Sequence, residues 1–349
     1  MADGSTQIAV DNYTADEWAA ESTASDITSL RSSINDYIYE NGRRYHAYHA
    51  GSYWGSNDEK AMDALDISYA FFSLSISWPF LIFSQAPRVH APAARQTSSR
   101  ANSRSGECMF PGLNVRLKSD FGQQRVLDVG TGTGLWAMDF ADLHPEASVI
   151  GTDLSPIQPA FVPSNLRFEV DDCCDEWLYE KPFDFIHVRG LFGCVSDWDR
   201  FYKQALQNLV PGGYLEQAEW SVWVDSDDGS AKGTAMAQSG DISLDAAKKF
   251  GKSLQTVNEM EENMKKAGFS DVTVHTFKIP IGPWPQDKRL KTLGRYQRLV
   301  WEESLEMWVM MLWTSILGVS AYPSSDFLIA NGLSVAARRG RGPFNGNSK

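Results

Sequence analysis

The residues whose types and spacing allow chemistry begin in one glycine-rich stretch, VLDVGTGTG, at positions 126–134. Gly130, Gly132 and Gly134 leave the backbone open to a bound molecule, because glycine has no Cβ and tolerates the positive φ of a tight turn. No Gly-Lys-Ser/Thr follows them, so the stretch lacks the lysine that reaches nucleotide phosphates in a P-loop. The pattern therefore argues against ATP hydrolysis.

The spacing is G-x-G-x-G, whereas dinucleotide-binding loops use G-x-G-x-x-G. Asp128 stands just before the glycines, where its carboxylate would attract a cation and repel a pyrophosphate. Asp153 ends the next predicted strand, where an acid can accept both ribose hydroxyls. Asp172 follows the strand after that, where a carboxylate can accept from an adenine amino group, with Cys173 beside it. These acids favour S-adenosylmethionine, a cationic adenosine without phosphate, and NAD is the alternative ligand.

Alternating strands and helices must hold these side chains together. The pattern predicts strands at 125–129, 148–153, 166–170, 183–188, 213–220 and 271–281, and helices at 135–144, 197–209, 244–267 and 293–317. Such alternation requires crossover connections and a parallel sheet. The carboxyl ends of parallel strands share one edge, so the glycine turn, Asp153 and Asp172 are expected to meet there.

Three other segments differ in composition from this core. Residues 1–35 are polar and acidic, which predicts a disordered leader, and 331–349 predict a disordered tail. Residues from about 84 to 118 are rich in Ser, Ala, Arg and Pro, so an irregular insertion is expected there. One domain is therefore expected over 36–330.

Charge and cysteine content limit the partners and the compartment. The formal net charge of -12 would not attract nucleic acid or an anionic membrane surface. The four cysteines lack zinc spacing, so no metal is expected, and their number fits a reducing compartment, the cytoplasm or the nucleus. The uncharged stretch 67–83 contains four serines and a proline and is shorter than a typical membrane span. It predicts a buried helix and no stable membrane insertion.

With these residues in place, the chain resembles the class I S-adenosylmethionine-dependent methyltransferases, and more narrowly the fungal LaeA-like methyltransferases of secondary metabolism. The resemblance rests on GRRYHAY, SYWGSNDE, VLDVGTGTGLWAMDFAD, VIGTDLSPIQPAFVPSNLRFEVDD, FDFIHVRG, LVPGGYLEQAEW and FKIPIGPWPQD. It implies an α/β, Rossmann-like fold with a mostly parallel seven-stranded sheet and helices on both faces. The family's final strand has only 333–337, LSVAA, as a weak counterpart here.

The resemblance also implies roles for individual residues. It assigns the methionine end of the cofactor to Asp128, Gly130, Gly132 and Gly134, the ribose to Asp153 and Leu154, the adenine to Asp172 and Cys173, and closure over the cofactor to Tyr53 and Asn57. His187 and Arg189, at the end of the fourth predicted strand of the core, would face the point where the methyl group leaves sulfur.

The residues around the acceptor allow two interpretations each. His187 is the candidate general base, because imidazole titrates near neutral pH, or it is a strand histidine bonded to the backbone. Arg189 binds a substrate carboxylate or pairs with Glu219, which is itself either a substrate contact or a structural partner. Trp284 and the Met- and Trp-rich segment 307–313 roof an apolar pocket or pack in the core.

The function that the resemblance implies is methyl transfer from S-adenosylmethionine to a small-molecule secondary metabolite in a fungal biosynthetic pathway. The acidic, short leader favours a pathway enzyme over a nuclear regulator. The alternative is a LaeA-like nuclear regulator that acts through protein partners.

Overall fold

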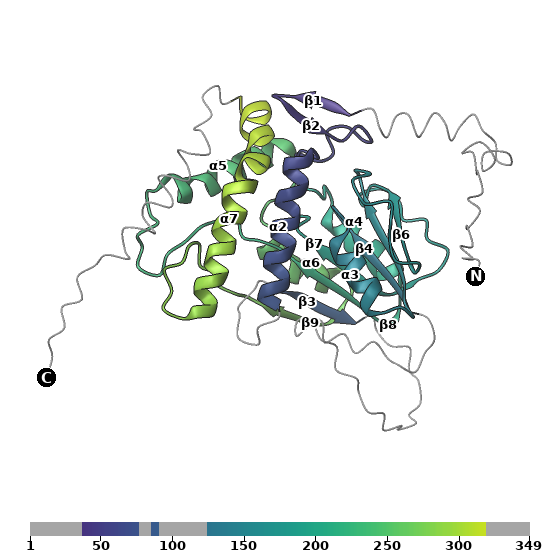
Figure 1. The fold of residues 1–349 in the computed structure, drawn as a ribbon. Helices are drawn as coiled ribbons and strands as arrows, with labels where there is room; N and C mark the ends of the chain where they lie inside the picture. The colour runs from purple at the N-terminus through teal and green to yellow at the C-terminus, as the bar shows by residue number, and fades with distance from the viewer. Residues whose placement is uncertain (1–36, 77–84, 91–123, 319–349) are drawn as a thin grey trace, which may run out of the picture.

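The computed structural model describes residues 37–76, 85–90 and 124–318 (Figure 1). The strands are β1 (Ile38–Glu40), β2 (Arg43–Tyr45), β3 (Gln85–His90), β4 (Arg125–Val129), β5 (Ser148–Asp153), β6 (Leu166–Val170), β7 (Phe183–Arg189), β8 (Leu209–Ala218) and β9 (Ser270–His275). Strands β1 and β2 form a small hairpin, and the others form a seven-stranded sheet in the order β6-β5-β4-β7-β8-β3-β9. The neighbours from β6 to β8 run parallel, whereas β3 is antiparallel to both β8 and β9.

Helices cover both faces of this sheet. They are α2 (Glu59–Ile76), α3 (Leu135–Leu143), α4 (Trp198–Gln207), α5 (Ala235–Phe250), α6 (Thr256–Ala267) and α7 (Lys288–Met310), and α7 continues into the π-helical turn η1 (Met311–Ile316). Helix α3 packs on β5 and β6, while α4 contacts β8 and α6 contacts β3 and β9. Helices α2 and α7 lie side by side in front of the sheet (Figure 1). The predicted α/β class with a mostly parallel seven-stranded sheet is confirmed.

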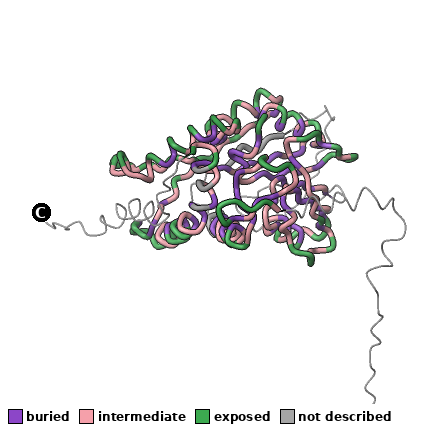
Figure 2. The backbone as a smooth tube through the Cα atoms, turned by 90° about the horizontal axis from the view of Figure 1, so that it is seen from above, coloured by how far each residue is buried: buried purple, intermediate pink, exposed green. Residues whose placement is uncertain are grey.

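Strand β4 shows why the sequence forms a buried strand here. Successive side chains point to opposite faces, so Val126 packs with α3 while Leu127 and Val129 pack with α4 and α6. All three side chains are buried, because a parallel sheet with helices on both faces has little contact with water. Buried residues accordingly gather in the interior of the molecule and exposed ones around its outside (Figure 2). Asp128 is therefore a charged residue in an apolar strand.

The predicted irregular insertion is wrong for residues 85–90. These residues form β3, which inserts antiparallel between β8 and β9, with Gln85 opposite both Ala218 and His275. A strand in this position gives both neighbouring strands a hydrogen-bonding partner and leaves neither of them as an open edge on that side. The sheet thus reaches seven strands with a segment from before β4, and the weak C-terminal candidate 333–337 lies outside the described residues.

Two other predicted elements differ in their bounds. The predicted helix 244–267 is two helices, α5 and α6, because Gly251 ends α5 in the left-handed conformation with φ of 79°. The predicted helix 293–317 corresponds to the end of α7 together with η1.

The first part of the stretch 67–83 belongs to α2, as predicted. No helix in the described part of the chain is long and apolar enough to cross a membrane. The predicted leader and tail lie outside the described ranges.

Candidate active site

One pocket opens at the carboxyl ends of β4, β5, β6 and β7, under residues from α2 and α7. The residues predicted from the sequence that line it are Tyr53, Asn57, Asp128, Gly130, Gly132, Asp153, Leu154, Asp172, Cys173, His187 and Arg189. These residues come from five separate segments of the chain, so the fold brings together what the sequence places far apart. From the predicted Met- and Trp-rich segment, Met307 and Trp308 line the same pocket.

Gly132 and Gly134 of the glycine turn have different surroundings. Gly132 lines the pocket with a φ of 59°, and a Cβ there would make only an ordinary contact, with Leu65 at 3.7 Å. Its N–H donates to Asp153 Oδ2 at 2.9 Å. Gly134, with φ of 84°, begins α3, and a Cβ there would come within 2.3 Å of Phe168. Gly134 is therefore required by packing against β6, and it does not line the pocket.

Asp128 is held by its own neighbours. Its Oδ1 lies 2.7 Å from His187 Nδ1, and its Oδ2 accepts from Thr131 Oγ1 at 2.6 Å. The His187 ring stacks on Trp136 with centroids 3.8 Å apart and an interplanar angle of 4°. Both carboxylate oxygens therefore have a protein partner, so Asp128 orients the histidine and the glycine turn at the same time.

Asp153 joins the glycine turn to the loop after β5. It accepts from Gly132 N–H and from Ser155 N–H, both at 2.9 Å. Burial raises the pKa of Asp153 to about 6, and the two backbone hydrogen bonds oppose this shift. Asn57, which is buried, donates to Ser155 Oγ at 3.1 Å and so closes the same loop from the N-terminal side.

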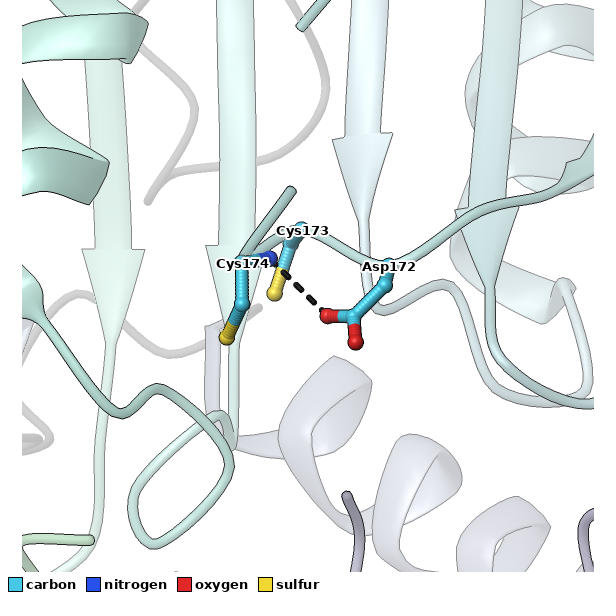
Figure 3. Close-up of side chains that lie close together, drawn as sticks. All are labelled: Asp172, Cys173 and Cys174. Carbon is cyan, nitrogen blue, oxygen red and sulfur yellow. Dashed lines mark hydrogen bonds between the residues drawn. The ribbon is translucent and has the colours of Figure 1, made fainter. Parts of the chain in front are cut away.

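Asp172 lies at the third strand end, beside two cysteines (Figure 3). Its Oδ1 accepts from Cys174 N–H at 2.9 Å, and its Oδ2 lies 2.9 Å from His49 Nδ1. Burial favours the neutral form of Asp172, but these hydrogen bonds outweigh it and lower its pKa. The thiol of Cys173 lowers the pKa of Cys174 to about 6 by donating a hydrogen bond to it.

Arg189 ends β7 and lines the same pocket. Its guanidinium lies over the rings of Tyr69 and Phe72, with centroid distances of 5.1 and 4.9 Å. Burial lowers the pKa of Arg189. No hydrogen bond or ion pair recorded among the described residues includes this side chain. The alternative pairing with Glu219 does not form.

Two predicted substrate contacts lie elsewhere. Glu219 does not line the pocket; it is buried and accepts from the N–H groups of Leu191 and Phe192, at 3.3 and 3.1 Å, and from Gln217 Nε2 at 2.8 Å. It therefore holds the loop after β7 in place. Trp284 is 60% exposed and does not line the pocket, because its segment packs outside it before α7 begins.

Several residues of the site were missed by reasoning from the sequence. His49 contacts Asp172 from a segment more than 100 residues earlier in the chain. Lys252 donates to the carbonyl oxygens of Ser52 and Cys194 and so joins the N-terminal segment to the loop after β7. A polar residue in a loop gives no local signal of such a long-range contact.

Within the part of the chain that the structure describes, two groups of side chains have ligand atoms close enough to share a metal ion. They are Asp172 with Cys173 and Cys174, and His49 with Asp172 and Asp175. The first group is the one drawn in Figure 3. Both share Asp172, whose oxygens already accept hydrogen bonds from His49 and the Cys174 backbone. The sequence-based expectation of no metal remains a prediction.

The donor set of the pocket fits S-adenosylmethionine. A Cβ at Gly132 would meet no close neighbour, carboxylates end three neighbouring strands, and among the described residues no lysine lines the pocket to meet a phosphate. Together with the Rossmann-like sheet, this site defines a class I S-adenosylmethionine-dependent methyltransferase. The chain belongs to the methyltransferase domain family, whose model matches residues 100–274, and within it to the LaeA-like fungal methyltransferases.

Three relatives illustrate the range of this family. Methyltransferase pytC of Aspergillus terreus is 37% identical over 298 residues, which cover 85% of this chain and 82% of pytC. The secondary metabolism regulator LAE1 of Cochliobolus heterostrophus is 32% identical over 78% of this chain and 80% of its own length. The protein-methionine methyltransferase laeA of Emericella nidulans is 29% identical and covers 80% of this chain and 66% of its own length.

Proposed function

We propose that this enzyme methylates a small-molecule secondary metabolite and that the acceptor binds beside the cofactor, under α2 and α7. The observation that carries the proposal is the apolar wall of the pocket next to Arg189. This wall consists of Leu65, Phe72, Trp220, Met307 and Trp308. Aromatic and aliphatic walls with few polar groups are typical of sites for small organic ligands.

The cofactor side of the proposal assigns each strand end to one part of S-adenosylmethionine. The glycine turn at Gly130 and Gly132 would hold the methionine end, Asp153 the ribose and Asp172 the adenine, with Tyr53 and Asn57 over them. S-adenosylmethionine supplies an electrophilic methyl group when bound. The protein's part in such a transfer is mainly proximity and orientation, which a rigid strand-end site provides.

A second candidate function is methylation of a protein or regulation through protein partners. It is favoured by the relatives described as a secondary metabolism regulator and as a protein-methionine methyltransferase. The higher identity to pytC and the enclosure of the acceptor region by α7 favour the small-molecule enzyme. The three cysteines of the described residues are free thiols, which suits our proposal of a cytoplasmic or nuclear location.

Deletion of the gene with metabolite profiling separates the two functions. For a pathway enzyme we expect loss of one methylated product and accumulation of its precursor. The precursor is lighter by about 14 mass units, one CH₂, because it carries a hydrogen where the product carries the methyl group. Loss of many unrelated metabolites would instead indicate the regulator. The matched control is a strain that carries Asp153→Ala, which we expect to reproduce the deletion if activity needs the cofactor.

A further inference from the structure

Arg189 is the one permanently cationic side chain among the described residues that line the pocket. It ends β7, one strand beyond β4, so it lies outside the row of acids at the ends of β4, β5 and β6. The sheet edge therefore has a cofactor half with carboxylates and a second half with a guanidinium. The two halves meet at Asp128 and His187, which pair directly across β4 and β7.

The surroundings of Arg189 hold the guanidinium without neutralising it. Tyr69 and Phe72, both on α2, present their rings to it, and a ring face attracts a cation but leaves its N–H groups free for other acceptors. Asp128, whose charge acts on Arg189, has both oxygens engaged by His187 and Thr131. Glu216 is the other carboxylate whose charge acts on Arg189.

A partly buried guanidinium with five N–H donors is stabilised by an anion of planar shape, and a carboxylate fits its fork with two hydrogen bonds. The walls beside it, Phe72, Trp220 and Trp308, are aromatic. We propose that Arg189 binds an anionic group of the acceptor, so that the substrates of this enzyme are aromatic or apolar carboxylic acids. This inference rests on the proposed function, since it concerns the acceptor half of the same site.

The test measures binding of acids and their neutral esters to the full chain saturated with S-adenosylhomocysteine. The probes are benzoate, 2-naphthoate and 2-anthracenecarboxylate, each with its methyl ester, followed by ligand-observed NMR. The wild type is expected to bind at least one acid ten-fold or more tightly than its ester, in keeping with a charge-assisted hydrogen bond. Arg189→Gln is expected to bind acid and ester equally. Arg167→Gln, at an exposed arginine of β6, is the matched control and should retain the preference.

Three results would overturn the proposal. One is a wild type that binds no acid of the panel more tightly than its ester. Another is an Arg189→Gln variant that keeps the preference. The third is loss of S-adenosylhomocysteine binding in Arg189→Gln by calorimetry, because Arg189 would then hold the amino-acid carboxylate of the cofactor.

If Arg189→Gln does not fold, Arg189→Lys replaces it, and a reduced but measurable preference is expected because the charge remains without the planar fork. Cofactor binding by the wild type tests the proposed function separately.

Discussion

Asp128 and His187 face each other across β4 and β7, and Asp128 Oδ1 lies 2.7 Å from His187 Nδ1. Both side chains are buried. A carboxylate can only accept, so Nδ1 must carry the proton and Nε2 is the ring nitrogen left to act as an acceptor. The stacking on Trp136 fixes the plane of the ring. The pair thus sets both the tautomer and the orientation of His187 at the pocket wall.

His187→Gln tests whether this imidazole acts as a base. We expect kcat to fall about 100-fold or more, because a positioned base contributes on that order, while the Kd for S-adenosylmethionine changes little. Steady-state kinetics and calorimetry give the two quantities. A variant with nearly unchanged kcat and lower thermal stability would assign His187 a structural role. Asp128→Asn is expected to lower kcat as well, since a neutral amide stabilises the imidazolium that forms on proton uptake less than a carboxylate does.

The second prediction concerns Asp153 and pH. Its pKa is raised from 3.8 to about 6, so the carboxylate that would accept the ribose hydroxyls is protonated below pH 6. The affinity for S-adenosylmethionine should therefore weaken as pH falls through about 6, and Asp153→Ala should lose at least ten-fold at pH 7.5. Calorimetry at several pH values measures both effects. Asp142→Ala, at an exposed position of α3, is the control, and full affinity in Asp153→Ala would refute the ribose assignment.

The third prediction concerns the stability contributed by Glu219. Burial raises its pKa from 4.5 to about 7, so the folded state holds the proton more tightly than the unfolded chain. For an acid shifted upward, stability is highest below pH 4.5 and declines until pH 7. Relative to Glu219→Gln, the wild type should lose about 3 kcal/mol of unfolding free energy across that window. Urea unfolding at pH 4.5 and pH 8 measures this difference.

The control for this experiment is Glu180→Gln, because Glu180 is exposed. Its unfolding free energy should follow that of the wild type at both pH values. Parallel curves for the wild type and Glu219→Gln would contradict a buried carboxyl that keeps its proton. Glu219→Ala is expected to be less stable by about 1–3 kcal/mol at any pH, because the N–H groups of Leu191 and Phe192 lose their acceptor.

The fourth prediction concerns the reactivity of Cys174. The hydrogen bond from the Cys173 thiol lowers the pKa of Cys174 to about 6, so at pH 7 most of this thiol is thiolate. Alkylation by iodoacetamide, followed by peptide mass spectrometry, should rise with a midpoint near pH 6. Cys173→Ala removes the donor and should move the midpoint upward. Cys194 is the internal control, because burial raises its pKa. Alkylation of Cys174 that begins only above pH 8 would contradict the assignment.

The meeting of the strand-end residues in one pocket was predictable from the sequence. Asp128, Gly132, Asp153 and Asp172 each stand at or just after a strand whose apolar pattern is clear. Parallel strands end at one edge, so local patterns alone were sufficient to place these residues together. Glu219 and Trp284, which the structure places outside the pocket, lie beyond the regular strands, where the direction of a side chain depends on loops.

The sequence by itself determined the class of the fold, the strand-end acids and the group that the cofactor donates, because these depend on patterns within short segments. Only the tertiary structure decided that residues 85–90 complete the sheet, that His49 reaches Asp172, and that Tyr69 and Phe72 flank Arg189. Each of these contacts joins segments far apart in the chain. Their formation depends on the packing of the whole domain, which no local spacing of residue types encodes.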